Sequence, residues 1–188
     1  MYEIALDDTA RLRPLDPWRA EEFLAHLERG RDFIGQFIPF GSTAVDVDSA
    51  RAALQRYADM RAADTGGLHG IWVDNTLVGG VLSLNVEPER GNAEVGCWLE
   101  PAATGRGLIT RAMRPLLDWL VDERGMRRVE WVAASGNVPS LNVARRLGFS
   151  KEGVRREANP WRGVRHDLEI WSLLAREWPS ARAALDAR

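Results

Sequence analysis

Hydrophobic residues in the N-terminal third of the chain recur mainly at helical spacing. A helix is predicted from Val47 to Ala63, where apolar residues recur at intervals of three and four: Ala50, Ala53, Leu54, Tyr57 and Met60. An earlier helix should begin at Asp16-Pro17, because Asp suits a cap and Pro suits a first turn. This helix is expected to run to about Arg29, and Gly30 should end it.

Extended segments dominate the centre of the chain. Four strands are predicted from their apolar runs and the turn residues between them, at about 11–14, 68–73, 76–86 and 92–100. Asp74-Asn75 forms the tight turn between the second and the third of these strands, and Gly79-Gly80 is expected to weaken or bend the third. These strands indicate an antiparallel meander.

Helical and extended segments alternate after Pro101. A helix is predicted from Leu108 to Gly125, with a kink at Pro115 because proline lacks the backbone N–H that a helix needs. The later elements are a strand near 129–133, a short helix from Asn137 to a stop at Gly148, and strands at about 149–157 and 164–173 around a turn at 159–163. A frayed tail is expected after Trp178.

The composition fits one globular domain. A chain of 188 residues, 45% hydrophobic and 28% charged, can bury a sizeable core. We therefore expect one domain over residues 1–178 and a C-terminal tail over 179–188. The formal net charge of -2 excludes the overall basic excess of a dedicated nucleic-acid binder, so no nucleic-acid partner is expected.

Cysteine and membrane signals place the chain in the cytoplasm. The single cysteine, Cys97, cannot form an intrachain disulfide, and no second thiol or histidine cluster offers zinc-ligand spacing, so no metal is predicted. No apolar run reaches the roughly 20 residues that span a bilayer, and the start Met1-Tyr2-Glu3 lacks the basic-then-apolar order of a signal peptide. A cytoplasmic protein without membrane contact is expected.

A glycine turn between a strand and a helix is the first chemical signal. Thr104-Gly105-Arg106-Gly107 precedes the helix predicted from Leu108. Such a turn leaves backbone N–H groups unpaired at the positive end of a helix dipole, which favours a phosphate. A pair of glycines alone is equally consistent with a plain helix start.

Three motifs together resemble the GNAT superfamily of acyl-CoA N-acyltransferases. The segment TGRGLI at 104–109 resembles the family's Gln/Arg-x-x-Gly-x-Gly/Ala turn, although Thr104 and Ile109 depart from it. AEVGCWL at 93–99, and the spaced residues from Asn137 to Phe149, are similar to the subgroup that acetylates the N-termini of ribosomal proteins. The ending, including Gly163, His166-Asp167 and Glu177-Trp178, extends the likeness over nearly the whole chain.

This resemblance implies an α/β fold, with a mixed, mostly antiparallel sheet of about seven strands and flanking helices. It implies direct transfer of an acetyl group from acetyl-CoA to a primary amine in a ternary complex, and a homodimer. The amine is a protein N-terminal α-amine or a small-molecule amine. The residues implied in binding the cofactor are Cys97, Trp98, Leu99, Thr104, Gly105, Arg106, Gly107, Leu108, Ile109, Asn137, Ser140 and Arg146.

The resemblance also suggests catalytic residues, each with a plainer alternative. Ala144 occupies the position of the tyrosine that many members use to protonate the thiolate, so Ser140 is the predicted acid, or else a cap of the short helix. Asn137 either contacts the pantetheine or caps the same helix. Gly96 either forms a bulge that turns an amide toward the thioester carbonyl or simply allows close packing.

The general base has no clear counterpart. Glu94 is the candidate, although a strand carboxylate is more often solvated or paired. Asn159 stands at the position of the ribosomal enzymes' glutamate, Glu157 is only its neighbour, and a water chain is an alternative. Cys97 as a covalent nucleophile is disfavoured, because no His-plus-acid arrangement is visible beside it.

Aromatic residues of the N-terminal region are the candidate acceptor site. Phe33 and Phe37, with Asn159, are predicted to bind substrate, and Trp18 and Phe40 lie in the same region; the alternative is that these aromatics are core. His26 and His69 are expected at the surface or the edge of the core. A rival function is an acyl-CoA-binding regulatory or partner-binding module without turnover.

Overall fold

The computed structural model describes residues 3–187 as a mixed α/β fold. The chain forms two compact units, one of Met1–Leu84 with Cys97–Met113 and one of Asn85–Gly96 with Arg114–Arg188. We call them the first and the second unit. Residues singled out in the sequence occur in both units.

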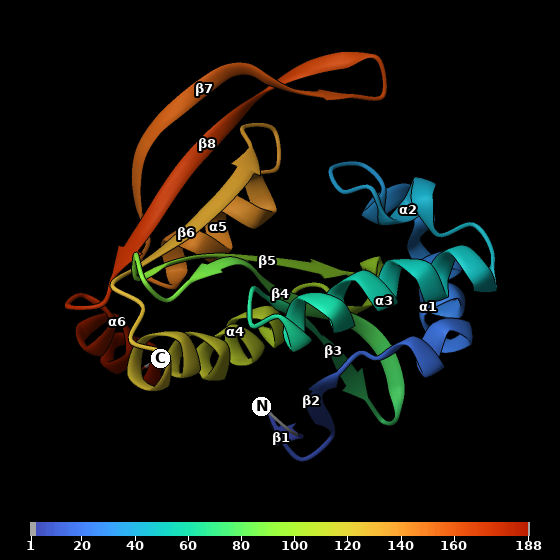
Figure 1. The fold of residues 1–188 in the computed structure, drawn as a ribbon, viewed down its shortest axis with the longest axis horizontal. Helices are drawn as coiled ribbons and strands as arrows, with labels where there is room; N and C mark the ends of the chain where they lie inside the picture. Colours follow the sequence, from blue (N-terminus) through green and yellow to red (C-terminus); the bar gives the residue numbers. More distant parts are fainter. Residues whose placement is uncertain (1–2, 188) are drawn as a thin grey trace. The chain divides into compact units, whose positions relative to one another are not determined.

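Eight strands hydrogen-bond in the order β1-β2-β3-β4-β5-β6-β8-β7 (Figure 1). The pair β5 and β6 is parallel, whereas the pairs β1–β2, β2–β3, β3–β4, β6–β8 and β7–β8 are antiparallel. The strands are β1 (Ile4–Ala5), β2 (Ala10–Pro14), β3 (Gly67–Val73), β4 (Thr76–Glu87), β5 (Asn92–Leu99), β6 (Arg128–Ala134), β7 (Ser150–Trp161) and β8 (Val164–Leu174). The predicted fold class is confirmed, with one strand more than expected because the two-residue β1 is too short to leave a pattern.

The predicted helices are present in the predicted order, together with two that were not expected, α2 and α6. They are α1 (Ala20–Ile34), α2 (Phe40–Thr43), α3 (Val47–Ala62), α4 (Leu108–Asp118), α5 (Val138–Arg146) and α6 (Trp178–Asp186). Pro115 lies inside α4, and the chain leaves α geometry four residues later in a π-helical turn, Trp119–Glu123. Helix α6 occupies the segment where a frayed tail was expected; the indole Nε1 of Trp178 donates to Asp118 at 2.9 Å, and Arg182 pairs with the same carboxylate at 2.8 Å.

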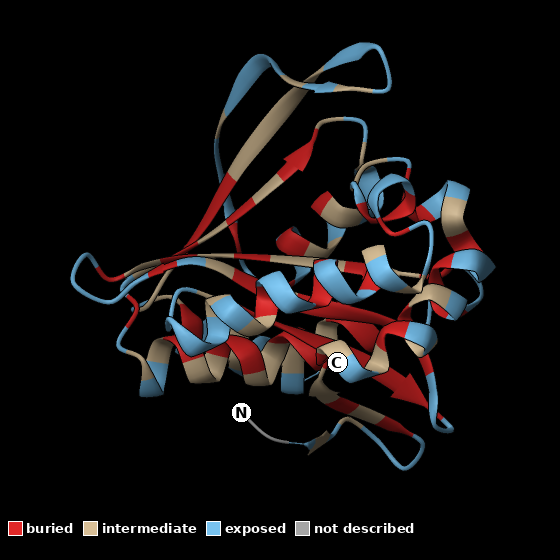
Figure 2. Ribbon diagram, turned by 45° about the vertical axis from the view of Figure 1, so that its right-hand side comes forward, coloured by how far each residue is buried: buried red, intermediate tan, exposed pale blue. Residues whose placement is uncertain are grey.

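Aromatic side chains form the centre of the core in the first unit. Phe23, Phe40 and Trp98 meet edge to face, with ring centroids 5.3 to 6.4 Å apart. Burial of each such side chain contributes about 1.5–3 kcal/mol. Buried residues from α1, α3 and β3 continue this core, as the red segments of Figure 2 show. Phe40 is therefore core, which settles one of the two alternatives for that residue.

Gly80 in β4 makes room for Trp98. A Cβ atom on Gly80 would collide with the Trp98 ring, and one on Gly79 would collide with the backbone of Trp98 and with Leu99. The ladder between β3 and β4 is also irregular between Ile71, which pairs with Gly79, and Trp72, in agreement with the expectation that this glycine pair weakens or bends the strand. The absence of two side chains lets the indole pack directly on β4.

Two expectations about the first helix are wrong. Asp16 makes no capping bond; its buried carboxylate pairs with Arg61 of α3 instead. Gly30 does not end the helix but kinks it, with φ -147° and ψ 23°, and α1 continues to Ile34. A Cβ on Gly30 would lie 2.8 Å from Pro101 Cδ, so glycine here permits close contact with the segment that follows β5.

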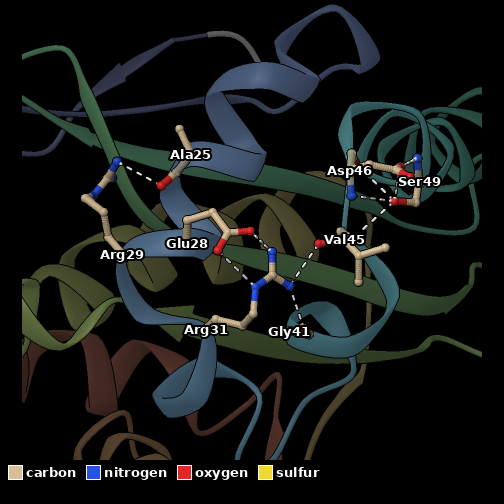
Figure 3. A network of polar contacts seen from close by, with 9 residues as sticks. Ala25, Glu28, Arg29, Arg31, Gly41, Val45, Asp46 and Ser49 are labelled. Atoms are coloured by element: carbon tan, nitrogen blue, oxygen red, sulfur yellow. Dashed lines mark hydrogen bonds and ion pairs between the residues drawn. The ribbon is translucent and has the colours of Figure 1, made fainter.

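Arg31 fixes the segment between α1 and α3 (Figure 3). Its Nη1 donates to the carbonyl of Gly41 at 2.6 Å and to that of Ala44 at 3.0 Å, and its Nη2 pairs with Glu28. At the start of α3, Asp46 and Ser49 form a reciprocal capping box. One guanidinium therefore ties the apolar connector to the C-terminal end of α1.

In the second unit, β7 and β8 form a long hairpin (Figure 1). Its turn is Arg162-Gly163, both with positive φ, at 49° and 78°. The predicted turn at 159–163 was too long, since Asn159 still pairs with His166 in the ladder. Most of β7 is exposed.

Candidate functional site

The glycine turn has the backbone conformation that its sequence predicts. Gly105 and Gly107 lie at φ +75° and +72°, in the left-handed region that glycine adopts without a steric cost. The chain enters this turn through a 3-10 segment, Pro101–Ala103, and Thr104 Oγ1 donates back to Pro101 O at 2.8 Å. Both glycines are therefore favoured by conformation, and the phosphate-binding role of the turn stays a prediction.

The amides of this turn are available to a ligand. Within residues 3–187, the N–H groups of residues 105–107 have no hydrogen-bond acceptor, and the first bond of α4 runs from Arg111 N to Gly107 O at 3.1 Å. A Cβ built on Gly105 would meet no atom within 4 Å. The turn thus presents exposed donors beside the positive end of a helix, the arrangement that binds phosphate groups.

Several predicted cofactor residues can contribute only through their backbone. The side chains of Leu108 and Ile109 are buried, with 1% and 7% of their surface exposed, and Trp98 is in the aromatic core. Leu99 is half-buried, whereas Thr104 and Arg106 are exposed. The Trp98 side chain is thus part of the core, and a role of Trp98 in cofactor binding stays a prediction.

Arg111 was missed by the sequence analysis. Its Nη1 lies 3.6 Å from the position of a Cβ on Gly107, and its Nη2 pairs with Asp7 at 3.0 Å. Asp7 is itself held by the N–H groups of Thr9 and Ala10, at 2.8 and 2.7 Å, and these bonds lower the pKa of its carboxyl. The only sequence signal was the position of Arg111, one helical turn after Gly107.

A buried chain of hydrogen bonds holds Glu100, which lies between β5 and the 3-10 segment that leads to the glycine turn. Trp98 Nε1 donates to His26 Nε2 at 3.0 Å, so His26 carries its proton on Nδ1 and donates it to Glu100 at 3.0 Å. Arg29 Nε also donates to Glu100, at 2.8 Å. Burial lowers the pKa of His26, which keeps the ring neutral. Helix α1 thereby holds the end of β5, where the segment leading to the turn begins.

Both histidines, which were expected at the surface or the edge of the core, are buried. His26 has no exposed surface and His69 has 6%. His69 Nδ1 has no partner among the described residues, and burial lowers the pKa of this ring to about 4. Sequence pattern did not reveal this, because burial of a histidine depends on neighbours far along the chain.

In the second unit, Ser140 is held at two atoms. Asn137 Oδ1 accepts the Ser140 N–H at 3.3 Å. Asn137 therefore caps α5, which is one of the two roles considered for it. The Ser140 hydroxyl oxygen accepts the indole Nε1–H of Trp131 at 3.0 Å. Ser140 is half-buried. Its hydroxyl keeps its own proton to donate.

Glu94 is a half-buried carboxylate on β5. Asn85 Nδ2 donates to Glu94 Oε2 at 3.1 Å, and Glu130 occupies the neighbouring position on β6. Burial, and to a smaller extent the charge of Glu130, raise the pKa of Glu94, whereas the Asn85 bond opposes the shift. A raised carboxyl pKa suits a general base. Asn85 itself has a positive φ of 48° within β4.

Gly96 and Cys97 follow the end of a ladder. The parallel pairing of β5 with β6 covers Asn92 to Val95, so it stops one residue before Gly96. The bulge expected at Gly96 stays a prediction. Burial raises the pKa of Cys97 to about 12, which keeps it a neutral thiol and argues against a covalent nucleophile.

The remaining predicted residues are partly accessible. Phe33 is 46% exposed and Phe37 is half-buried. Asn159 lies in β7 and not in a loop, while Glu157 sits in the irregular stretch between Arg155 and Asn159, where its N–H donates to Asp167 at 2.7 Å. Arg146 is exposed at the end of α5. Substrate binding by Phe33, Phe37 and Asn159 stays a prediction.

Within residues 3–187, two features are absent: a metal-binding cluster of side chains and a membrane-spanning helix. No group of three or more His, Cys, Asp or Glu side chains there is arranged to hold a metal ion. In the same part of the chain, no helix has both the length and the apolar character needed to cross a membrane.

Comparison with known proteins is consistent across sequence and structure. The family model "Acetyltransferase (GNAT) domain" matches residues 10–150. The "Putative ribosomal N-acetyltransferase YdaF" of Bacillus subtilis (strain 168) is 30% identical over 95% of this chain and 98% of that protein. A crystal structure described as "Probable acetyltransferase" superposes with a TM-score of 0.88 at 30% identity, over 95% of this chain and 99% of the other.

A more distant structure supports the fold alone. It is RimL, a ribosomal L7/L12 alpha-N-protein acetyltransferase in complex with coenzyme A, with a TM-score of 0.86 at 20% identity. The alignment covers 92% of this chain and 97% of that one.

Proposed function

This chain belongs to the GNAT acetyltransferase family, and from that premise we propose that it acetylates the N-terminal α-amine of a protein. It is an acetyl-CoA-dependent N-acetyltransferase, as its family and its relatives are. The observation that supports donor binding by this chain's own residues is the Gly105-Gly107 turn, with its left-handed glycines and free amides. We propose that these amides bind the pyrophosphate of CoA.

The acceptor is proposed from two observations. The relative that aligns along nearly the whole chain carries "ribosomal" in its name. In the first unit, Trp18 is 76% exposed and Phe33 is 46% exposed, which provides apolar surface for a peptide rather than for a small polar amine. A ribosomal-protein N-terminus is therefore the acceptor we propose first.

The proposed chemistry is direct attack of the amine on the thioester. Glu94 removes a proton from the attacking ammonium or amine, the new C–N bond forms, and the C–S bond breaks with its electron pair on sulfur. Ser140 supplies a proton to the thiolate, and its oxygen regains one from water. These roles need a carboxylate of raised pKa and a hydroxyl with a free proton, which are the states of Glu94 and Ser140.

Glu94 and Trp131, the residue whose indole holds Ser140, lie on opposite faces of the β5–β6 pair. Glu94 is paired in register with Glu130, and Val95 with Trp131, whose indole holds Ser140. Successive side chains of a strand point to opposite faces. The backbone of the pair therefore separates Glu94 from Trp131, and we propose that water molecules carry the proton from the amine to Glu94.

An acceptor panel tests the proposal. The purified protein is incubated with acetyl-CoA and with three peptides of one sequence, one with a free N-terminus, one with a blocked N-terminus and one blocked but containing a lysine, and with spermidine. Thiol release and product mass are measured. Acetylation of the free α-amine alone is expected. Preference for spermidine or for the lysine would contradict the acceptor we propose, whereas CoA binding with no thiol release from any amine would favour the regulatory module.

Two further predictions accompany this function. The family resemblance predicts a homodimer, and the single thiol Cys97 predicts a reducing cytoplasmic location. Size-exclusion chromatography with light scattering measures the first of these directly.

A further inference from the structure

A serine hydroxyl that acts on a departing thiolate needs a fixed direction. A free hydroxyl rotates among several rotamers and among several hydrogen-bond partners. Catalytic acids act efficiently only when the proton lies within hydrogen-bond reach of the reacting atom. The surroundings of Ser140 therefore matter as much as its identity.

Ser140 is fixed through its backbone and its side chain. Its N–H donates to the cap residue Asn137, at 3.3 Å, and its Oγ accepts the indole N–H of Trp131, at 3.0 Å. The indole donor is itself immobile. Trp131 is 1% exposed on β6, and its ring meets Phe149 edge to face at 5.8 Å.

The donor also determines where the serine proton can go. An indole N–H can only donate, so Trp131 occupies a lone pair of Oγ and cannot take the hydroxyl proton. Within residues 3–187, the Ser140 hydroxyl proton has no hydrogen-bond acceptor. A hydrogen bond received at an oxygen also polarises its O–H, which makes the proton a better donor.

We propose that Trp131 is a positioning residue for the transfer reaction, which aims the Ser140 hydroxyl proton away from β6 and toward the departing sulfur. This inference rests on the acid role proposed for Ser140. In the step concerned, the C–S bond breaks, the sulfur takes the electron pair and then the Ser140 proton, and Oγ recovers a proton from solvent water. Because Trp131 is only 1% exposed, it acts through Ser140 and not by direct contact with a ligand.

The sequence contains a matched control for Trp131. Trp171 on β8 is the direct register partner of Trp131 and is also buried, with 5% exposed. Its Nε1 donates to Glu169 at 2.9 Å and not to Ser140. Trp171→Phe therefore loses the same ring area and the same kind of donor without touching the serine.

A double-mutant cycle tests the proposal. The turnover number and the CoA dissociation constant are measured for Trp131→Phe, Ser140→Ala, the double variant and Trp171→Phe, each with its melting temperature. We expect Trp131→Phe to lower turnover about tenfold, the effect of losing one neutral hydrogen bond, with CoA affinity unchanged. Ser140→Ala should lower it further, and the double variant should be no slower than Ser140→Ala.

The outcomes distinguish the acid role of Ser140 from the positioning role of Trp131. Wild-type turnover in Ser140→Ala would overturn the acid role and this inference with it. A slow Ser140→Ala together with multiplicative losses in the double variant, or with equal losses in Trp131→Phe and Trp171→Phe, would overturn the inference alone. If Trp131→Phe fails to fold, site-specific replacement of Trp131 by benzothienylalanine keeps the ring shape and removes only the N–H, and wild-type turnover there would equally overturn it.

Discussion

The cofactor turn of the first unit is formed by backbone groups, whereas the Ser140 region of the second unit is formed by side chains. The turn is a backbone site, in which Gly105 and Gly107 expose amides and Arg111 is the nearby charge. The Ser140 region is a side-chain site, in which an amide cap and an indole hold one hydroxyl. A backbone site should control affinity for the donor and a side-chain site should control the rate of transfer. Mutations can test this division.

The largest expected effect is on the rate, at Glu94. Glu94→Gln should lower turnover by about 10²- to 10⁴-fold, the usual contribution of a general base, while CoA affinity stays the same. Because the base acts as a carboxylate, wild-type activity should rise with pH through its raised pKa. The pH–rate profile of the variant should lose that limb.

Glu130→Gln is the matched control for that limb. Glu130 is paired with Glu94 in the β5–β6 register and its charge raises the pKa of Glu94. Removing this charge should move the rising limb to lower pH and leave the maximal rate nearly unchanged. If the rising limb of the pH–rate profile stays in place in Glu130→Gln and persists in Glu94→Gln, the titrating group is not Glu94.

A smaller effect, on affinity alone, is expected at Gly107. Gly107→Ala should weaken CoA binding about tenfold or more, because the new methyl group occupies space beside the amides and strains a φ of +72°. Gly125→Ala is the control, since Gly125 has a φ of +67° and open space around it. Both variants should lose about 1 kcal/mol of folding stability, measured by denaturant unfolding, so a CoA affinity reduced equally in both would remove the turn from the site.

The smallest effect is expected at Arg111. Arg111→Gln should weaken CoA binding about three- to tenfold, with a loss that shrinks as salt is raised, because its guanidinium lies beside Gly107 at the surface. The control is Arg114→Gln, one helical turn after Arg111. This substitution breaks the ion pair between Arg114 and Asp186 and should leave CoA binding normal. Equal affinities for wild type and Arg111→Gln at low salt would limit Arg111 to its contact with Asp7.

The same contrast explains how much the sequence could predict. The turn was predictable because glycine at positive φ is a local property of the chain. Most strands and helices were predictable from periodicity, as for α3 and β6. Ser140 was singled out only through its motif, and the partner that holds it, Trp131, lies nine residues away on another element.

Misses in the prediction share one physical cause. Asp16 had the right residue type and position for a cap, yet Arg61, 45 residues later, offers its carboxylate a charged partner. Gly30 had the local signature of a helix end, yet α1 kinks there, where glycine allows close approach to Pro101, and continues to Ile34. His26 was expected at the surface or the edge of the core, because its partners, Trp98 and Glu100, are more than 70 residues away. In each case tertiary packing overrode a local preference.

The most direct test of the account measures two quantities in two variants. The CoA dissociation constant and the single-turnover rate at saturating acetyl-CoA are determined side by side for Gly107→Ala and Ser140→Ala. The account predicts that Gly107→Ala loses affinity and keeps a rate within about threefold of wild type, whereas Ser140→Ala keeps its affinity and loses rate by about 10²-fold or more. Loss of both quantities in both folded variants, or the reverse assignment, would contradict the division between a backbone site for binding and a side-chain site for transfer.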